Sequence, residues 1–477
     1  MLISSRDKIT KSYDVIVIGS GLAGMTAANK LAKNGRSVLL LEAHNKLGGF
    51  ATWFYRAGKK HVFDISLHGF PFGMKKTCRK YWNKEIADLI VQLKDVRFVN
   101  PQYQIQSSFT REDFTQKLNE HFKVPLEQIN SFYNYIEAMN FYDDQQMTNA
   151  ELFEKFFPGR NDIVRFLMEP IVYANGSTLD DPAISYGIVF SNFMKKGVYT
   201  FSGGTDHLIK LMQKELLANN VDIRKHAKID EIVVEKGVVK GVRFKGELIP
   251  ARAVLSNANI KTTITKLIGS EYLPSDYVEE AKKVRLNSSS CQVYIGIKPG
   301  EKIKPIGDLV FTSTYPTFNT QALLDKNITS RTFSVYYPEG RPFDQEEKYA
   351  IVSSTNANWD DWAQLSEEEY AKEKEKMIKE TIEALEKFVP DIRDKIDFID
   401  AATPKTIKKY THHENGSSFG TKFEGLSVSM NLHKKLPGVF HAGSVGIIMS
   451  GWLGAANYGV IQSNEIESFL YNQDKEG

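Results

Sequence analysis

The sequence predicts an α/β protein in which a Rossmann-like nucleotide-binding domain carries an inserted domain of mixed α+β structure. Near the N-terminus, a short β-branched run leads directly into a glycine-rich turn and a helix. A strand pattern returns at residues 253–258, and a second glycine-rich turn precedes the last helix. The length of 477 residues exceeds one ordinary domain, so we expect two closely packed ones.

Composition is typical of a globular protein, with 42% hydrophobic and 25% charged residues. The formal net charge of +3 gives no reason to expect a nucleic acid as partner. The N-terminus lacks the apolar core of a secretory signal, and no apolar stretch approaches the ~18 residues of a membrane-spanning helix. Cys78 and Cys291 are far apart, which argues against a disulfide framework or a cysteine-based metal site. We expect a cytoplasmic protein, either soluble or bound to a membrane surface, with no metal.

The N-terminal segment carries a dinucleotide-binding signature. Residues 13–18 predict a buried strand, and Gly19, Gly21 and Gly24 follow it in GxGxxG spacing. The three glycines permit the tight turn, the approach of backbone to a pyrophosphate, and the packing of helix on strand. The helix start offers free N–H groups to phosphates. A second strand ends at Glu42, which can accept hydrogen bonds from ribose hydroxyls. A glycine-rich turn without a ligand is the alternative, but the whole pattern favours a dinucleotide.

A second glycine pair favours FAD over NAD. Gly48-Gly49 stands six residues beyond Glu42 and resembles the extended fingerprint of FAD enzymes related to amine oxidases and phytoene desaturases. In those enzymes the small residues let the chain pass close to the cofactor's diphosphate. The pair alone could be an ordinary turn, whereas this spacing predicts FAD. No second GxGxxG indicates a separate NAD(P)H domain.

The rest of the chain divides into blocks. A turn at residues 200–205 precedes an amphipathic helix, and strand patterns follow over residues 221–258. A long helix opens with the capping box Ser366-Glu367-Glu368-Glu369 and stops before Pro390. We expect these blocks in chain order: 12–74, first FAD-binding segment; 75–192, mainly helical and facing substrate or membrane; 193–260, second FAD-binding segment; 261–400, substrate domain of strands and helix; 401–477, third FAD-binding segment.

Motifs along nearly the whole chain resemble the carotenoid (phytoene-type) desaturase, carotenoid isomerase and retinol saturase group of FAD-dependent oxidoreductases. A strand at residues 439–444 is followed by Gly451-Trp452-Leu453 at the start of the last helix. The other marks are Phe63-Asp64, the turn Ser202-Gly203-Gly204-Thr205, and Thr403-Pro404-Lys405-Thr406 with Tyr410-Thr411, Gly416 and Gly420.

The resemblance implies where the cofactor lies. Gly443 and Ser444 would contact the ribityl and diphosphate portion, and Ile229 the adenine. The start of the last helix would face the flavin's pyrimidine edge, where its dipole stabilises negative charge. The expected cofactor-binding residues are Gly19, Ser20, Gly21, Leu22, Ala23, Gly24, Glu42, Ala43, Gly48, Gly49, Phe50, Ser66, Ile229, Gly443, Ser444, Gly451, Trp452 and Leu453.

The sequence departs from the group's pattern close to the expected reaction face. Many members carry Asp at the position of Ser444, so the ribityl contact here would be a neutral hydrogen bond. Residues 447–450 replace a Pro-Gly stretch, and Ser66 replaces a glycine.

The resemblance implies a desaturase of a carotenoid or related isoprenoid polyene. A substrate CH₂ in an apolar tunnel between the domains would give a hydride to flavin N5 while a neighbouring carbon loses a proton. A carotenoid cis-trans isomerase or polyene saturase is the first alternative. An amine or amino-acid oxidase of the same fold is the second, and it should show a polar substrate anchor. A non-catalytic prenyl-binding escort is the third, although such proteins tend to lose the glycine fingerprint.

His68 is the one candidate for catalysis, because histidine can titrate near neutral pH. The alternative is a histidine merely hydrogen-bonded beside the cofactor. An apolar substrate partitions into membranes, so we also expect a membrane-docking surface. Residues 74–82 and 184–199 have the composition of interfacial segments. A surface helix and a buried core segment are the alternatives for these two stretches, and nothing in the sequence indicates an oligomeric state.

Overall fold

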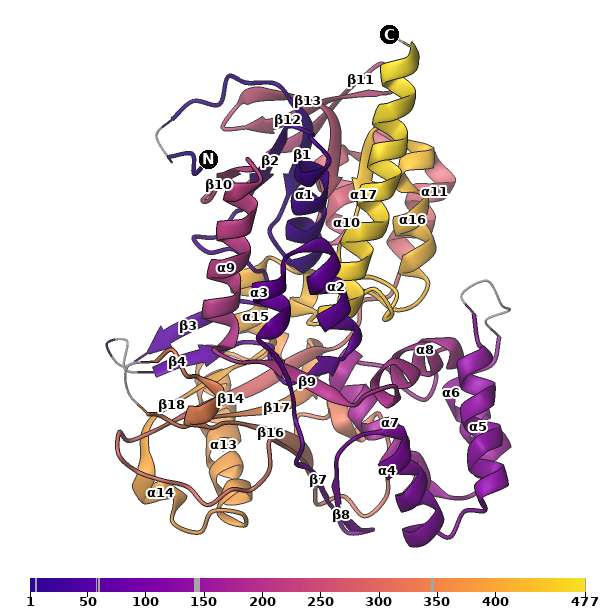
Figure 1. Ribbon diagram of the computed structural model, residues 1–477, viewed down its shortest axis with the longest axis vertical. Helices are drawn as coiled ribbons and strands as arrows, with labels where there is room; N and C mark the ends of the chain where they lie inside the picture. The colour runs from indigo at the N-terminus through magenta and orange to yellow at the C-terminus, as the bar shows by residue number, and fades with distance from the viewer. Residues whose placement is uncertain (5–6, 57, 59–60, 141–145, 345–346, 477) are drawn as a thin grey trace.

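The computed structural model describes residues 1–4, 7–56, 58, 61–140, 146–344 and 347–476 (Figure 1). Two large sheets dominate it, one in the upper and one in the lower half of the view, and a group of helices flanks the lower sheet. The predicted fold class, a Rossmann-like domain combined with a mixed α+β part, is confirmed. In the upper half, both chain termini lie beside the nucleotide-binding sheet.

The upper sheet has the strand order β10-β2-β1-β13-β12-β11, and β19 pairs with β13. Parallel pairing joins β1 to β2 and to β13, and joins β13 to β19. Residues from three separate stretches of the chain therefore complete one sheet. Its strands are β1 (Tyr13–Ile18), β2 (Val38–Leu41), β10 (Asp222–Arg224), β11 (Glu231–Glu235), β12 (Val238–Phe244), β13 (Glu247–Ser256) and β19 (Val439–His441).

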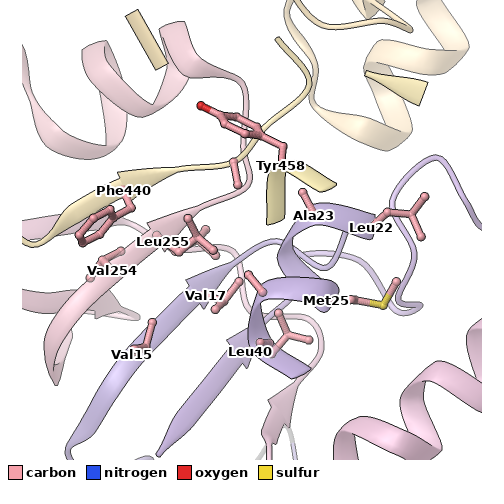
Figure 2. Packing of buried hydrophobic residues seen from close by; sticks show 14 of the residues in the cluster. Val15, Val17, Leu22, Ala23, Met25, Leu40, Val254, Leu255, Phe440 and Tyr458 are labelled. Carbon is pink, nitrogen blue, oxygen red and sulfur yellow. The ribbon is translucent and has the colours of Figure 1, made fainter. Parts of the chain in front are cut away.

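Helices α1 (Leu22–Lys33) and α17 (Gly451–Glu476) pack together against this sheet. A Cβ on Gly459 would lie 2.2 Å from the carbonyl oxygen of Ala23, so the two helix backbones approach as closely as glycine allows. The continuous apolar strands have side chains buried on both faces. Figure 2 shows this packing for Val15, Val17, Leu22, Ala23, Met25, Leu40, Val254, Leu255, Phe440 and Tyr458.

The lower sheet has the order β18-β14-β17-β16-β15-β7-β8. Helix α13 (Glu367–Glu386) packs on one face, where Met377 and Leu385 join Ile295 and Phe333 in one apolar cluster. The predicted capping box of this helix is confirmed. The strands are β7 (Val96–Val99), β8 (Gln104–Ser107), β14 (Ser289–Ile297), β15 (Leu309–Ser313), β16 (Ser330–Tyr336), β17 (Ala350–Ala357) and β18 (Ile396–Ala402).

The stretch 75–192 is less purely helical than the sequence predicts. It contributes β6 (Ile90–Gln92), β7 and β8, and β7 joins the lower sheet by pairing in parallel with β15. These strands are only three or four residues long, too short for their alternation to stand out. Its helices are α3 (Lys84–Asp88), α4 (Arg111–Gln116), α5 (Leu126–Ala138), α6 (Asn149–Phe156), α7 (Asn161–Asn175) and α8 (Ala183–Met194).

Shorter elements connect the two halves. Strands β5 and β9 pair with each other close to where the helical region meets the upper half. The other strands and α-helices are β3 (Trp53–Arg56), β4 (His61–Asp64), β5 (Phe70–Pro71), α2 (Gly73–Tyr81), β9 (Val198–Phe201), α9 (Gly204–Ala218), α10 (Ile260–Thr262), α11 (Ser275–Lys283), α12 (Asp360–Ala363), α14 (Ile392–Lys395), α15 (Pro404–Thr411) and α16 (Gly425–Lys435).

Residues 184–199 are mainly a buried segment and not an apolar surface. Tyr186, Phe190 and Met194 of α8 are buried in the apolar cluster of the helical region. The alternative interpretation of this stretch, a core segment, therefore holds for α8. Within the described part of the chain, no helix combines the length and apolar character needed to cross a bilayer.

Because α1 and α17 approach closely, one methyl group added at their contact should destabilise the fold. Gly459→Ala places a Cβ against the backbone of Ala23, and we expect it to destabilise the fold by about 1–3 kcal/mol. Thermal unfolding followed by circular dichroism measures this change. Gly340→Ala is the matched control, because no atom lies within 4 Å of the place that its Cβ would take. Equal midpoints for both variants would contradict the packing described here.

Candidate functional site

The turn between β1 and α1 is built by close backbone contacts. Gly19 has φ +94°, a conformation that favours glycine. A Cβ on Gly24 would lie 2.2 Å from the carbonyl oxygen of Gly19, and one on Gly21 would lie 2.6 Å from Asn257 Oδ1. The side chain of Asn257 is fixed by its own bond to the carbonyl of Ala442, at 2.6 Å. The turn therefore has no room for larger residues, and its N–H groups stay close to the surface where a phosphate would bind.

Glu42 lies at the end of β2, directly beside this turn. Its Oε2 accepts hydrogen bonds from the backbone N–H of Ser20 at 2.8 Å and from the Ser20 hydroxyl at 2.5 Å. Its Oε1 accepts one bond, from the N–H of His44 at 2.7 Å. A carboxylate oxygen has two lone pairs, so Oε1 keeps acceptor capacity for another donor such as a ribose hydroxyl.

The pair Gly48-Gly49 lies against the same turn. The N–H of Gly48 donates to the carbonyl of Ser20 at 2.9 Å, and a Cβ on Gly49 would lie 3.0 Å from the Cα of Gly21. The structure thus brings together the two glycine motifs that are separated in sequence. Phe50 follows, and its carbonyl accepts a hydrogen bond from the Ser66 hydroxyl at 2.8 Å.

Ile229 follows β10 on the chain, and its side chain is buried. Its backbone N–H and carbonyl form no hydrogen bond with any other residue in the described part of the chain. Unpaired backbone groups of this kind can be satisfied by the edge of an adenine ring. The glycine turn, Glu42 and this backbone therefore fit the diphosphate, ribose and base of an adenine dinucleotide.

The predicted flavin end of the site is formed by the first turn of α17. Gly451 has φ +65°, and the indole N–H of Trp452 donates to the carbonyl of Ser66 at 3.2 Å. Leu453 lies close to Gly73, where a Cβ would be 2.8 Å from its Cδ2. The helix start is therefore held against the segment 66–73, which contains His68.

His68 is tied to the lower sheet by three polar side chains. Its Nδ1 is 2.8 Å from Ser334 Oγ, and its Nε2 is 3.2 Å from Ser354 Oγ and 3.3 Å from Gln292 Nε2. Burial lowers the pKa of His68 to about 4. This shift does not favour titration near neutral pH, the sequence-based reason for choosing His68. The hydrogen-bonded neutral histidine matches the alternative interpretation, and a direct catalytic role stays a prediction.

Sequence reasoning missed these three partners. Gln292, Ser354 and Ser334 come from β14, β17 and β16, which are neighbours in the sheet. A serine or glutamine within a strand carries no spacing signal that identifies a distant partner. Only the register of the sheet brings them to His68.

Sequence reasoning also missed Arg341, a buried residue that joins both halves of the molecule. Its guanidinium contacts Asp64 at 3.2 Å, Asp206 at 2.6 Å and Asp344 at 2.8 Å. Burial alone would lower the pKa of Arg341, but Asp64 and Asp206 raise it above its ordinary value. Asp64 also accepts a bond from the N–H of Thr205 at 2.7 Å.

This ion cluster explains two sequence motifs together. A Cβ on Gly204 would overlap the Arg341 guanidinium, so the glycine in the turn before α9 leaves room for it. The Thr205 hydroxyl donates to Asp64 Oδ1 and lies 3.2 Å from the carbonyl oxygen of Thr52, close to the Gly48-Gly49 segment. Phe63-Asp64 and the turn at residues 202–205 thus form one buried junction, with Arg341 at its centre.

Replacing Arg341 with an uncharged residue should greatly lower the stability of the fold. Arg341→Met leaves Asp64 and Asp206 buried without their partner, and we expect a cost of about 3–5 kcal/mol. Chemical denaturation followed by tryptophan fluorescence measures it. Arg393→Met is the control, because Arg393 is 49% exposed and its ion pair with Glu386 lies at the surface, so its loss should change the stability little. A similar small cost for Arg341→Met would show that the junction contributes little.

Comparison with known proteins agrees with this geometry. Residues 17–84 match a family described as an NAD(P)-binding Rossmann-like domain. The chain is 26% identical to a chloroplastic prolycopene isomerase from Daucus carota, across 86% of this chain and 72% of that protein. It is 23% identical to a 4,4'-diaponeurosporene oxygenase from Staphylococcus aureus, across 85% of this chain and 87% of that protein.

Among solved structures, the cyclohexylamine oxidase from Brevibacterium oxydans superposes with a TM-score of 0.65 at 13% identity. The match covers 97% of this chain and 100% of the oxidase. At this identity the likeness concerns the fold alone, and it extends over both sheets and the helical region.

Proposed function

We propose that this chain, a member of the carotenoid desaturase and isomerase family of flavin-dependent oxidoreductases, binds FAD and desaturates a carotenoid or related isoprenoid polyene. The similarity to prolycopene isomerases and diaponeurosporene oxygenases supports a carotenoid-like substrate. Cis-trans isomerisation and saturation of a polyene are the alternative reactions on the same substrate class. The intact glycine turn argues against a non-catalytic prenyl-binding escort.

The chain's own residues would hold and orient the cofactor. When bound, FAD would supply the hydride acceptor, N5, for a substrate CH₂, while a neighbouring carbon would lose a proton. Glu42 and the turn at residues 19–24 would bind the ribose and diphosphate, while Gly443 and Ser444 would contact the ribityl chain. The free N–H groups at the start of α17 would stabilise negative charge on the pyrimidine edge. The apolar tunnel between the domains stays a prediction.

The observation that carries this proposal is the uncharged surroundings of His68. This neutral imidazole contacts two hydroxyls and an amide, and the buried carboxylate of the same segment, Asp64, is already bound by Arg341 and Thr205. An amine substrate would be a cation that needs a free carboxylate or another polar anchor. These contacts therefore favour an apolar substrate over the amine-oxidase alternative.

Anaerobic bleaching of the flavin spectrum tests the proposed function. The FAD-loaded protein is mixed in detergent micelles with C30 and C40 polyenes, and separately with primary amines. We expect loss of flavin absorbance with a polyene only. Bleaching by amines alone would contradict the proposal. Geometric isomerisation of a polyene without net bleaching would favour the isomerase alternative.

The neutral state of His68 predicts a flat pH profile. Because its pKa is about 4, the imidazole is neutral above about pH 5, and flavin reduction should show no His68-dependent inflection between about pH 6 and 8. In the unfolded chain the imidazole of His68 is protonated below its ordinary pKa of 6.5. In the folded protein it stays neutral down to about pH 4. Unfolding free energy should therefore rise with pH between about 4 and 6.5.

The variant His68→Gln separates these effects. It should lose this part of the pH dependence of stability and keep the flat profile of flavin reduction. Stopped-flow reduction and denaturation across the pH range provide the two readouts. An inflection near pH 6.5 in the parent protein that disappears in the variant would instead identify His68 as a titrating catalytic group.

A membrane-docking surface is also part of the proposal, and it combines residues of both predicted interfacial stretches. The ammonium groups of Lys76 and Lys196 lie over the ring of Phe72, at 5.8 and 4.8 Å from its centroid. Its ring also packs on Tyr199 at 5.3 Å. Lys76, Lys196 and the neighbouring Lys195 are exposed. Positive charges around an aromatic ring suit the headgroup region of an anionic bilayer.

Charge reversal tests this surface. Each lysine near an anionic surface contributes about 1 kcal/mol, so the double variant Lys76→Glu/Lys196→Glu should bind phosphatidylglycerol vesicles at least about tenfold more weakly. Vesicle co-sedimentation measures the affinity. Lys372→Glu/Lys379→Glu is the control, since it makes the same charge change at two exposed positions of α13. Equal binding by both double variants would exclude this surface as the docking site.

A further inference from the structure

The segment that follows β19 is held by a buried, hydrogen-bonded histidine. His441 is the last residue of β19, and its side chain is buried together with those of Ser429 in α16 and Tyr458 in α17. Its Nε2 lies 2.8 Å from the carbonyl oxygen of Ala258, and its Nδ1 lies 2.6 Å from Ser429 Oγ. Ser429 Oγ is 2.5 Å from the hydroxyl oxygen of Tyr458. Four stretches of the chain therefore meet in one polar row within the apolar cluster of the upper half.

The contact with Ala258 determines the direction of every hydrogen bond in this row. A carbonyl oxygen can only accept, so Nε2 of His441 carries the proton and donates it. A neutral imidazole has one N–H, so Nδ1 accepts from the hydroxyl of Ser429, and Ser429 in turn accepts from Tyr458. Burial lowers the pKa of His441 to about 4, in agreement with a neutral ring. The row thus fixes one tautomer and one orientation of the imidazole.

The ring of His441 lies directly against Gly443, one of the predicted cofactor contacts. A Cβ on Gly443 would lie 2.5 Å from the carbonyl oxygen of Ala258 and 2.7 Å from His441 Nε2. The backbone of Gly443 therefore packs on the hydrogen bond between those two residues. A change in that bond would move Gly443 and its neighbour Ser444, the other predicted contact in this segment.

The residue before this carbonyl, Asn257, extends the connection to the glycine turn. Its Oδ1 lies 2.6 Å from the place that a Cβ on Gly21 would take, and its side-chain amide donates to the carbonyl of Ala442 at 2.6 Å. Asn257 and Ala258 therefore lie between the predicted diphosphate-binding turn and the segment 442–444. Two side-chain hydrogen bonds join them to that segment, one from Asn257 and one from His441.

We propose that His441 is a positioning residue of the cofactor site, which sets the spacing between the glycine turn and Gly443 through its bond to Ala258. This inference rests on the proposed function, because both backbones must face bound FAD for their spacing to matter. A ligand that contacts two backbones binds most tightly when their spacing is already correct. The side chain of His441 is fully buried, so it acts through the backbone and does not touch the reacting atoms.

Two substitutions at His441 separate positioning from simple packing. His441→Gln can still place an amide N–H near the position of Nε2, whereas His441→Asn is too short to reach Ala258 and keeps only a polar atom facing Ser429. Each variant loses a buried hydrogen bond, so both should lower the unfolding midpoint of the FAD-free protein. For FAD, we expect a dissociation constant within about threefold of the parent value in His441→Gln and at least about fivefold higher in His441→Asn.

Fluorescence titration of the FAD-free proteins with FAD gives the dissociation constants, and thermal unfolding gives the midpoints. His433→Asn is the matched control with unchanged affinity, because this partly exposed histidine of α16 stacks on Phe440. Equal affinity of His441→Asn and the parent protein, or equal weakening by Asn and Gln, would overturn the positioning role and leave the proposed function intact. If the parent protein binds no FAD, the proposed function fails as well.

Ser429→Ala decides the matter should His441→Asn fail to fold. It keeps His441 and its proton donor, and it removes only the hydroxyl that orients the ring. FAD binding should weaken at least about threefold, because the donor to Ala258 is then no longer held in place. Binding as tight as that of the parent protein would overturn the proposal.

Discussion

The close approach of backbones at the turn between β1 and α1 is the constraint on which the rest of the structure depends. A Cβ on Gly24 would lie against the carbonyl of Gly19, one on Gly49 against Gly21, and one on Gly459 of α17 against Ala23. Through these contacts, three stretches that are distant in the sequence pack together in one layer. The result is a tight glycine turn beside Glu42, with the start of α17 on the same side of the sheet.

The second constraint is the buried junction around Arg341, which belongs to the lower sheet's connecting loop but pairs with Asp64 and Asp206 of the upper half. Because ion pairs with low exposure are strongly directional, this junction fixes the segment that leads from Asp64 to His68. The lower sheet then holds His68 through Ser334 and its neighbours. The proposed cofactor-binding turn and the proposed substrate face are thus positioned relative to each other by polar contacts. The apolar clusters supply most of the burial.

Local sequence signals were sufficient for the strand and turn of the proposed nucleotide site and for the cap of α13. The apolar run at residues 13–18, the glycine spacing and the capping box at Ser366 each depend on neighbours in the chain, and the structure contains all three. The short strands β6 to β8 were not predicted, because their own residues carry little signal and they are strands through pairing with distant partners.

Residues that act through distant partners could not be found in this way. Nothing in the local sequence distinguishes Arg341 from other loop arginines, because its partner Asp64 is distant in the chain. Asn257 contacts the glycine turn only because β13 pairs with β1. His68 was singled out from the sequence, yet its burial, which lowers its pKa, and its partners on three strands are properties of the folded chain.

Titration of the flavin-free protein with FAD tests the central claim most directly. A matched titration of Glu42→Gln removes the charge of the proposed ribose acceptor at nearly constant size. Hydrogen bonds to a charged group contribute about 1.5–3 kcal/mol, so we expect saturable binding of one FAD per chain, weakened at least about tenfold in the variant. Failure of the unmodified protein to bind FAD at all would contradict the account.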